Sequence, residues 1–392
     1  MSNLSVTRDS TTKEKVTVHY LYIHIPFCIG KCDYCDFYSV PLGRSGADKS
    51  WKYVNALLKE MELRSDSAGN LRTVYLGGGT PTLLSPEQVA AVLSGVREIF
   101  SIASGAEITI EANPGTVSGR QLAALRETGI NRVSIGMQSL SDGDLSTLGR
   151  SHTVGDSLAA VSAARRAGFE NISIDLIYGI PGQNMDIWKN TMGRALALLP
   201  EHVSAYELTP EKSTPLYNKL ARGVYELPEE ALVIEMYYAA LEKLKAHGYL
   251  QYEISNFAKR GYESVHNLNY WDRGEYLGVG AGAHSFFKGK RTGNIPDLAR
   301  YIELINGKVM PVDEEITLTE QDEFNEMIFL GLRKTGGIDT GLGPDKEWLL
   351  KNKAVNALRR HGLIEIEDRC LRLTLKGLVM STEVMVQILS AT

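Results

Sequence analysis

Cysteine is scarce in this chain, which has only four among its 392 residues. So few cysteines cannot make the disulfide framework of a small secreted domain. Three of them, Cys28, Cys32 and Cys35, lie within eight residues of one another, a spacing that is typical of a metal site. The fourth, Cys370, stands alone near the other end of the chain.

Long hydrophobic runs and an excess of basic charge are also missing. No run of 18 uncharged apolar residues occurs, which argues against a membrane-spanning helix. Acidic residues outnumber basic ones by 47 to 42, so we expect no nucleic-acid partner. The first 17 residues have neither an apolar core nor an Arg-rich amphipathic pattern. We therefore expect residues 1–17 to form a flexible arm of a cytoplasmic protein rather than a targeting peptide.

The composition is otherwise that of a folded protein, with 43% hydrophobic and 23% charged residues. Short β-branched or aromatic runs alternate with amphipathic segments, which is the pattern of βα units around a parallel sheet. We expect strands at residues 18–25, 73–76, 107–111, 132–135, 172–177 and 203–208. Helices are expected between them at residues 52–64, 86–100, 119–128, 154–167 and 187–199.

These elements predict an α/β fold, an incomplete (β/α)6 barrel, over residues 18–305. The βα repetition ends with a helix at residues 229–247, which extended pieces follow. Beyond residue 306 the pattern changes to two helices, two short strands at 364–367 and 370–373, and a last helix. We expect a C-terminal winged-helix-like domain over residues 306–392.

The three clustered cysteines lie on one loop directly after the first expected strand, in the pattern CxxxCxxC. Three thiolates on one loop can bind one face of an iron-sulfur cube and leave its fourth iron without a protein ligand nearby. That open iron can chelate the amino and carboxylate groups of S-adenosylmethionine (SAM). A structural zinc site is the alternative, but it normally has four protein ligands. The spacing therefore favours a [4Fe-4S] cluster with SAM.

The segment from Tyr22 to Cys35, YxHIPFCxxxCxYC, resembles the start of the radical SAM domain in the oxygen-independent coproporphyrinogen oxidase family. Five further motifs resemble those of the family in order: GGGTPT at 77–82, EANP at 111–114, SIGMQS at 134–139, LGRxH at 148–152 and DLIYGIPG at 175–182. Each motif alone is weak, but six in order on successive strand ends form a specific pattern. The resemblance implies a radical SAM barrel.

Nine residues of these motifs are the expected SAM site: Tyr22, Tyr34, Gly78, Gly79, Thr80, Glu111, Gln138, Arg150 and Asp175. Gly78 and Gly79 lack a Cβ, so backbone groups can approach the methionine amine closely, although an ordinary turn also uses glycines. Thr80 can add a hydroxyl hydrogen bond, and the charged and amide side chains can hold the ribose, amino and carboxylate groups. The positions of Tyr22 and Tyr34 are implied by the resemblance.

The chain departs from the coproporphyrinogen oxidases proper at two places. Those oxidases have a fourth cysteine where this chain has Phe37, and a longer segment before the cluster motif than the 27 residues present here. The HNxxYW motif at 266–271 and the GxGxGAHS motif at 278–285 instead resemble the HemW-type haem chaperone branch of the family. The resemblance implies a haem chaperone. The alternative is a radical-SAM oxidoreductase that acts on a tetrapyrrole, like coproporphyrinogen III oxidase.

The HNxxYW motif is the candidate haem site. His266 can offer an imidazole nitrogen to haem iron, while Tyr270 and Trp271 offer flat faces to the macrocycle. His284 is a second candidate ligand. The alternative interpretation is that His266 and Asn267 cap or cross-link a loop while the two aromatic rings pack in the flank of the barrel.

The expected cofactors are a [4Fe-4S] cluster, SAM and haem. Expected partners are haem-accepting respiratory proteins and, because a reduced cluster can transfer an electron to SAM, a flavodoxin or ferredoxin as donor. An open iron near a rim of the protein also suggests a homodimer. Delivery of haem to respiratory enzymes suggests peripheral contact with a membrane. Cleavage of SAM by the chain is left open, and a radical SAM enzyme that modifies nucleic acid is a third, less favoured class.

Overall fold

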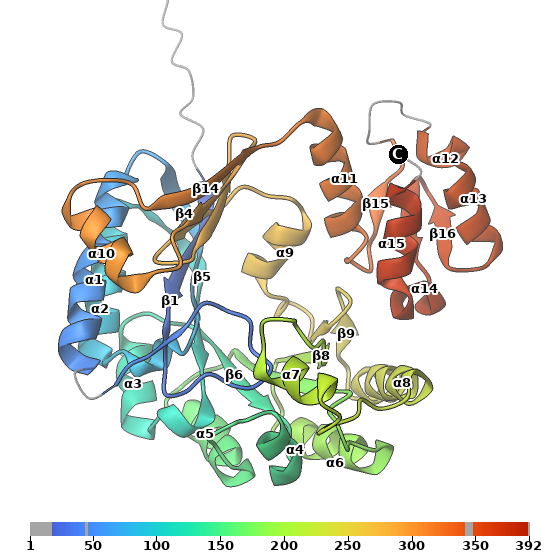
Figure 1. Cartoon of the computed structure of the whole chain (residues 1–392), viewed down its shortest axis with the longest axis horizontal. Helices are drawn as coiled ribbons and strands as arrows, with labels where there is room; N and C mark the ends of the chain where they lie inside the picture. Colours follow the sequence, from blue (N-terminus) through green and yellow to red (C-terminus); the bar gives the residue numbers. More distant parts are fainter. Residues whose placement is uncertain (1–17, 44–45, 342–347, 391–392) are drawn as a thin grey trace, which may run out of the picture.

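The largest element is a nine-stranded sheet in the order β11-β1-β4-β5-β6-β7-β8-β10-β9. The computed structural model describes residues 18–43, 46–341 and 348–390, so the expected arm at residues 1–17 lies outside the described residues. The two edge strands of the sheet do not pair with each other. The sheet is therefore an open partial barrel with helices on its outer face (Figure 1).

The six central parallel strands are those that the sequence predicts. They are β1 (Val18–Ile25), β4 (Ala68–Gly78), β5 (Ile102–Ala112), β6 (Arg132–Gln138), β7 (Ile172–Tyr178) and β8 (His202–Glu207). The helices that follow them are α1 (Gly46–Leu63), α2 (Pro86–Ile99), α3 (Gly119–Glu127), α5 (Val154–Arg166), α6 (Met185–Leu196) and α8 (Glu230–Ala246). The predicted (β/α)6 barrel is confirmed.

Three short strands extend this sheet, and they lie in the stretch where the sequence predicts extended pieces after the helix at 229–247. β11 (Leu277–Val279) pairs in parallel with β1, while β10 (Asn256–Ala258) pairs antiparallel with β8 and with β9 (Leu250–Gln251). Further short elements of the barrel are β2 (Phe27–Cys28), β3 (Val40–Pro41), α4 (Asp142–Thr147), α7 (Pro215–Ala221), α9 (Val265–Trp271), α10 (Leu298–Asn306) and 3-10 turns at Pro81–Leu83 and Pro114–Thr116. Such elements escape periodicity analysis because they are too short to repeat a pattern.

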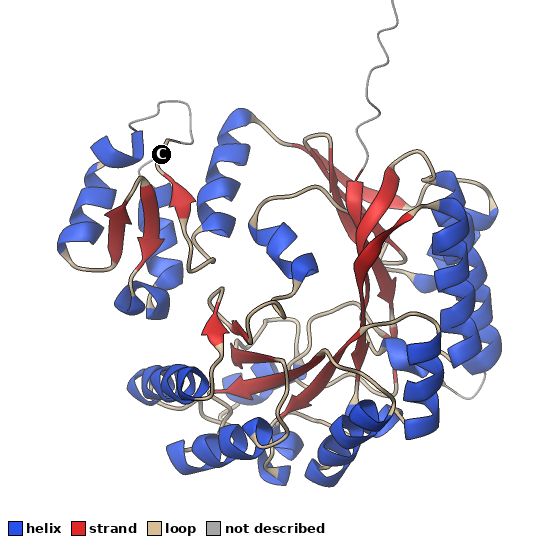
Figure 2. Ribbon diagram, turned by 180° about the vertical axis from the view of Figure 1, so that it is seen from behind, coloured by secondary structure: helices blue, strands red, loops and turns tan. Residues whose placement is uncertain are grey.

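A second sheet and a C-terminal domain complete the chain (Figure 2). The second sheet has the order β12-β13-β14, from β12 (His284–Phe287), β13 (Lys290–Asn294) and β14 (Val312–Thr317). The expected domain boundary at residue 306 falls between the paired strands β13 and β14 and stays a prediction. The C-terminal domain contains the predicted helices and two strands in order, but the second and last expected helices are each divided in two, and β15 is not predicted: α11 (Glu320–Gly331), β15 (Ile338–Asp339), α12 (Trp348–Lys351), α13 (Lys353–Arg360), β16 (Ile364–Glu367), β17 (Cys370–Leu373), α14 (Leu375–Val379) and α15 (Ser381–Leu389).

The hydrophobic core lies between the sheet and the outer helices. Successive residues of a strand point to opposite faces. On β4, Val74 and Leu76 are fully buried in this core, whereas Tyr75 lines a cavity inside the barrel. The outer face of the sheet is therefore apolar, and its inner face is available for function.

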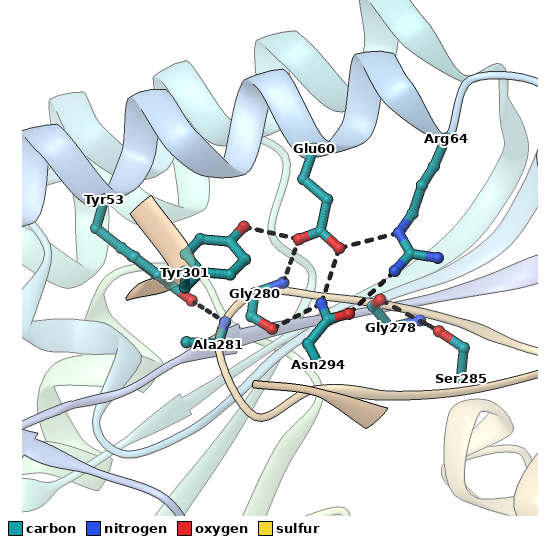
Figure 3. Close-up of polar contacts among 9 residues, drawn as sticks. All are labelled: Tyr53, Glu60, Arg64, Gly278, Gly280, Ala281, Ser285, Asn294 and Tyr301. Carbon is teal, nitrogen blue, oxygen red and sulfur yellow. Dashed lines mark hydrogen bonds and ion pairs between the residues drawn. The ribbon is translucent and has the colours of Figure 1, made fainter. Parts of the chain in front are cut away.

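A buried carboxylate joins four elements at the β11 edge (Figure 3). Glu60 of α1 is fully buried, and its Oε2 accepts hydrogen bonds from the Gly280 amide (2.8 Å) and the Tyr301 hydroxyl (2.7 Å). Its Oε1 accepts from Asn294 Nδ2 (2.8 Å) and Arg64 Nε (2.9 Å). One side chain thus holds α1, α10, β13 and the turn after β11 together.

Tyr53 extends this network towards the cysteine loop. Its hydroxyl donates to the His24 carbonyl (2.7 Å) and accepts from the Ala281 amide (3.1 Å). The carboxyl end of β1, from which the cysteine loop starts, is therefore tied to the β11 edge.

Loss of the Glu60 carboxylate should destabilise the fold strongly. Glu60→Ala leaves Arg64, whose side chain is 10% exposed, without its charge partner and removes four hydrogen bonds. We expect the free energy of unfolding to fall by about 3–5 kcal/mol, the usual cost of breaking a buried ion pair. Urea unfolding under nitrogen measures it. The exposed neighbour variant Glu62→Ala should leave stability unchanged, and equal effects of the two variants would contradict the role of Glu60.

Candidate functional site

The three clustered cysteines lie on the loop that follows β1 and includes β2. Cys28 Sγ is 3.7 Å from Thr80 Oγ1, and Arg150 Nη1 donates to Cys32 Sγ at 3.4 Å. Cys35 lines the same cavity as Thr80 and Arg150. The thiols therefore lie against two residues that the sequence assigns to SAM.

The donor set fits an iron-sulfur cluster. All four cysteines are free, and the clustered three are partly exposed. Within the described ranges, no group of three or more His, Cys, Asp or Glu side chains is arranged to hold a single metal ion. In a [4Fe-4S] cluster each thiolate binds a different iron, so the cysteines surround the cluster without converging on one point. Thiolates are also the soft ligands that iron-sulfur clusters take.

A cavity of about 670 Å³ lies beside the cysteine loop and extends into the barrel. We call it the cluster-side cavity. Eight of the nine predicted SAM residues line it: Tyr34, Gly78, Gly79, Thr80, Glu111, Gln138, Arg150 and Asp175. Tyr22 instead lines a neighbouring cavity. The volume is typical of a small-molecule site.

Gly78 and Gly79 shape the wall next to the cysteine loop. Gly78 has φ +110°, which side-chain-bearing residues rarely adopt, and a Cβ on Gly79 would lie 2.6 Å from the Phe27 carbonyl oxygen. The amides of Gly79 and Thr80 donate to the carbonyls of Ile25 (2.9 Å) and Phe27 (2.7 Å). A Cβ on Gly78 would lie 2.5 Å from the His24 ring, so both glycines are needed for close approach, and the amides of Gly79 and Thr80 are already used within the protein.

Glu111 stands at the end of β5 with a partly buried side chain. Tyr75 Oη donates to its Oε1 (2.8 Å) and the Gly78 amide to its Oε2 (3.1 Å). Burial raises the pKa of Glu111 to about 7; the Tyr75 hydrogen bond opposes this rise and the charge of Asp175 reinforces it. The carboxyl group therefore changes charge near neutral pH, and a cationic ligand group would favour its ionised form.

Asp175 of β7 is held by serine hydroxyls. Ser134 Oγ donates to its Oδ2 (2.9 Å), and Ser204 Oγ donates to its Oδ1 (2.7 Å). Burial raises the pKa of Asp175 despite these bonds. Sequence reasoning missed the serines, although serine at alternate positions of otherwise apolar strands is the signal that marks this polar inner face.

Gln138 ends β6 at a bulge. Its φ is +63°, and the register between β6 and β7 shifts between Gly136 and Gln138. Arg150 Nη2 donates to the Gly136 carbonyl at 2.9 Å. Since Arg150 also donates to Cys32, it links the bulge to the cysteine loop. Non-glycine residues with a positive φ of this kind are strained and cluster at functional sites.

A second cavity of about 590 Å³ adjoins the first. The two cavities share a wall formed by Asp36, Phe37, Tyr75, Gly78 and Glu111. The other ring-bearing residues that line the second cavity are Tyr22, His24, Tyr38, His266, Tyr270, Tyr276 and His284. We call it the aromatic cavity, because aromatic faces of this kind suit a flat apolar ligand.

His266 is part of the wall of the aromatic cavity and is only 1% exposed. Its Nδ1 is 2.6 Å from Thr73 Oγ1, and its Nε2 is 2.9 Å from Tyr270 Oη. Burial lowers its pKa to about 3, so the ring is neutral at neutral pH. Both ring nitrogens are engaged, and one hydrogen bond must open before this ring can bind a metal.

The rest of the HNxxYW motif divides between the cavity and the C-terminal domain. Asn267 and Tyr270 line the aromatic cavity, but Trp271 does not. The Trp271 ring instead stacks under the guanidinium of Arg333, 4.5 Å from the ring centroid. The structure thus brings Asn267 and Tyr270 to the predicted haem site and places Trp271 away from it.

His284 differs from His266 in its surroundings. It also lines the aromatic cavity, but its side chain is exposed, and no hydrogen bond to its ring is found in the part of the chain that the structure describes. Its strand pairs it with Gly293, on which a Cβ would lie 3.1 Å from the imidazole. The glycine therefore makes room for this ring at the cavity wall.

The comparisons with known proteins agree with this geometry. Residues 22–195 match the radical SAM superfamily, and residues 318–380 match the HemN C-terminal domain. The fold aligns with coproporphyrinogen III oxidase (HemN) from Escherichia coli at a TM-score of 0.82 and 22% identity, over 97% of this chain and 92% of that one. Fold, cysteine loop and family matches together define a radical SAM protein.

Relatives of known function narrow this class. The chain is 39% identical to the heme chaperone HemW of Bacillus subtilis, over 93% of this chain and 97% of that protein. It is 38% identical to HemW of Lactococcus lactis (81% and 82% covered) and 35% identical to the bovine radical S-adenosyl methionine domain-containing protein 1, mitochondrial (94% and 87%). The chain belongs to the HemW family.

Membership in the radical SAM superfamily implies a [4Fe-4S] cluster and SAM as cofactors. Among the described helices, none has both the length and the hydrophobicity to cross a membrane.

The raised pKa of Glu111 predicts a pH-dependent cost to stability. Because its pKa is about 7 in the folded chain and 4.5 as the ordinary value, the ionised carboxylate destabilises the fold increasingly as pH rises through this interval. The difference in unfolding free energy between Glu111→Gln and the wild type should therefore rise by about 2–3 kcal/mol in favour of the variant from about pH 5 to pH 8. Tyr75→Phe should move this transition to higher pH. A difference that does not vary with pH would contradict ionisation near neutrality.

Proposed function

We propose that this chain is a haem chaperone that binds haem in the aromatic cavity and transfers it to acceptor proteins. The observation that carries the proposal is a cavity lined by tyrosine and histidine rings that shares one wall with the cavity beside the cysteine loop. The relatives named heme chaperone HemW support it.

The cluster-side cavity is the proposed SAM site. Cys28, Cys32 and Cys35 would each bind one iron of the [4Fe-4S] cluster and leave the fourth iron open to SAM. When bound and reduced, such a cluster supplies one-electron chemistry to SAM. Glu111 offers a carboxylate to a cationic or hydroxyl group of SAM, and Arg150, next to Cys32, offers a cation to its carboxylate.

Phe37 favours an apolar ligand at the shared wall. It stands where the coproporphyrinogen oxidases proper are expected to have their fourth cysteine, lines both cavities and is 66% exposed. An exposed aromatic side chain at the meeting point of two cavities is unfavourable in water and is covered when a flat apolar ligand binds.

His284 is the iron ligand that the geometry favours, because its ring is exposed at the aromatic cavity. His266, which the sequence motif favours, becomes a ligand only if its bond to Tyr270 or Thr73 opens. In the closed state, His266 and Tyr270 offer their rings as part of the wall.

The proposed partners follow from this chemistry. Haem-accepting respiratory proteins receive the haem, and a flavodoxin or ferredoxin reduces the cluster. A homodimer formed near the open iron, and peripheral contact with a membrane during delivery, complete the proposal.

Haem titration of the purified protein, followed by the Soret band, tests the proposal. The wild type should bind haem, and His284→Ala should shift the Soret band and weaken binding by roughly tenfold or more, because an axial ligand is lost. His266→Ala should change the spectrum less. A larger effect of His266→Ala would return the ligand role to the HNxxYW motif, and absence of haem binding by the wild type would overturn the chaperone proposal.

The oxidase alternative is tested with the same preparation. Given coproporphyrinogen III, SAM and a reductant under nitrogen, the protein should form no protoporphyrinogen IX. Its formation would replace the chaperone proposal.

A further inference from the structure

A buried arginine lies at the far end of the cluster-side cavity. Arg132 is the first residue of β6, so it lies at the amino-terminal rim of the parallel strands, away from the cysteine loop at their carboxyl ends. It is 2% exposed. Its Nη1 donates to Asn171 Oδ1 (2.7 Å) and more weakly to the Tyr262 carbonyl (3.5 Å).

No carboxylate of the described residues forms an ion pair with this arginine. Its Nε has no hydrogen-bond partner, and no carboxylate lies within 4.0 Å of its guanidinium, in the described ranges of the chain. The charge of Arg132 acts on Asp175, but the oxygens of Asp175 accept hydrogen bonds from the hydroxyls of Ser134 and Ser204. Arg132 is therefore left with unused donors on the wall of a cavity.

A second unused donor stands beside it. Thr109 of β5 is the register partner of Arg132, and its fully buried hydroxyl also has no partner among the described residues. Glu111 and Ser134, two residues further along the same strands, are also register partners and line the cavity. Because side chains two residues apart share a face, Thr109 and Arg132 lie on the same side of the sheet as Glu111 and Ser134, and Arg132 is the one of the two that lines the cavity.

The neighbouring histidine does not compete with Arg132 for an anion. Both ring nitrogens of His202 are engaged, Nδ1 with Ser173 Oγ (2.8 Å) and Nε2 with Tyr252 Oη (2.8 Å). Burial lowers its pKa well below the ordinary value, so the ring is neutral. Arg132 is therefore the cation at this end of the cavity wall.

We propose that Arg132 binds a carboxylate of a ligand that enters the cluster-side cavity. A guanidinium presents parallel N–H donors that match a carboxylate, and a buried guanidinium without an anion is unfavourable. The carboxylate has two chemical sources. It is either a propionate that extends across the shared wall from haem in the aromatic cavity, in which case the inference rests on the proposed function, or a small free carboxylate that binds in the cluster-side cavity itself.

Haem and haem dimethyl ester distinguish the first source, because the ester has the same macrocycle without carboxylates. Wild-type protein reconstituted with its cluster should bind haem tighter than the ester by roughly ten- to a hundredfold. Arg132→Met should bring this ratio close to one. Asn171→Ala, which removes the Asn171 contact but keeps the guanidinium, is the matched control and should retain the preference.

Propionate and its neutral analogue propionamide probe the second source. In saturation-transfer NMR the wild type and Asn171→Ala should give a signal with propionate and none with propionamide, and Arg132→Met should lose the propionate signal. If the preference for haem over its ester is lost in Arg132→Met, the carboxylate is a haem propionate. If only the propionate signal is lost in Arg132→Met, the ligand is a free carboxylate.

The wild type alone decides the matter if Arg132→Met does not fold. Equal affinity for haem and its ester, together with no discrimination between propionate and propionamide, overturns the inference. Tight, equal binding of haem and ester leaves the chaperone proposal intact, whereas binding of neither tetrapyrrole overturns that proposal and leaves the propionate arm to test Arg132.

Discussion

The polar inner face of the partial barrel is the constraint on which the rest of the structure depends. Parallel barrels usually fill their interior with branched apolar side chains. Here the apolar residues of the strands, such as Val74 and Leu76, pack against the outer helices, while Glu111, Ser134 and Asp175 face the interior. Polar groups of this kind cannot collapse into a dry core without losing hydrogen bonds. Apolar packing therefore does not fill the interior, and cavities of ligand size remain inside it.

One wall links the two cavities that result. Tyr75 and Glu111 are hydrogen-bonded to each other and line both, so a ligand on either side meets the same pair. The charge of Glu111 changes near neutral pH, which makes the wall sensitive to a cation on one side and to an apolar surface on the other. The network around Glu60 fixes the β11 edge, from which His284 follows, and through Tyr53 it also holds the start of the cysteine loop.

Local signals made much of this site predictable. The cysteine spacing, the glycines and the strand ends can each be recognised from a short stretch of sequence. Eight of the nine SAM residues predicted from them line one cavity. Contacts between distant segments were not predictable. Glu60 meets Gly280 and Tyr301 more than 200 residues away, and no local pattern marks such a pair. The Trp271 ring contacts Arg333 of the C-terminal domain rather than the cavity that the rest of its motif lines, and this contact depends on how that domain packs.

The central claim is that two adjoining cavities hold separate cofactors. The most direct test measures the iron, sulfide and haem content of the triple variant Cys28→Ala, Cys32→Ala, Cys35→Ala. Reconstituted under nitrogen, the wild type should contain about four irons and four sulfides per chain. The triple variant should lose both while binding haem with unchanged stoichiometry, because the aromatic cavity has no cysteine in its lining. Retention of the non-haem iron, or loss of haem binding together with the cluster in a folded variant, would contradict the account.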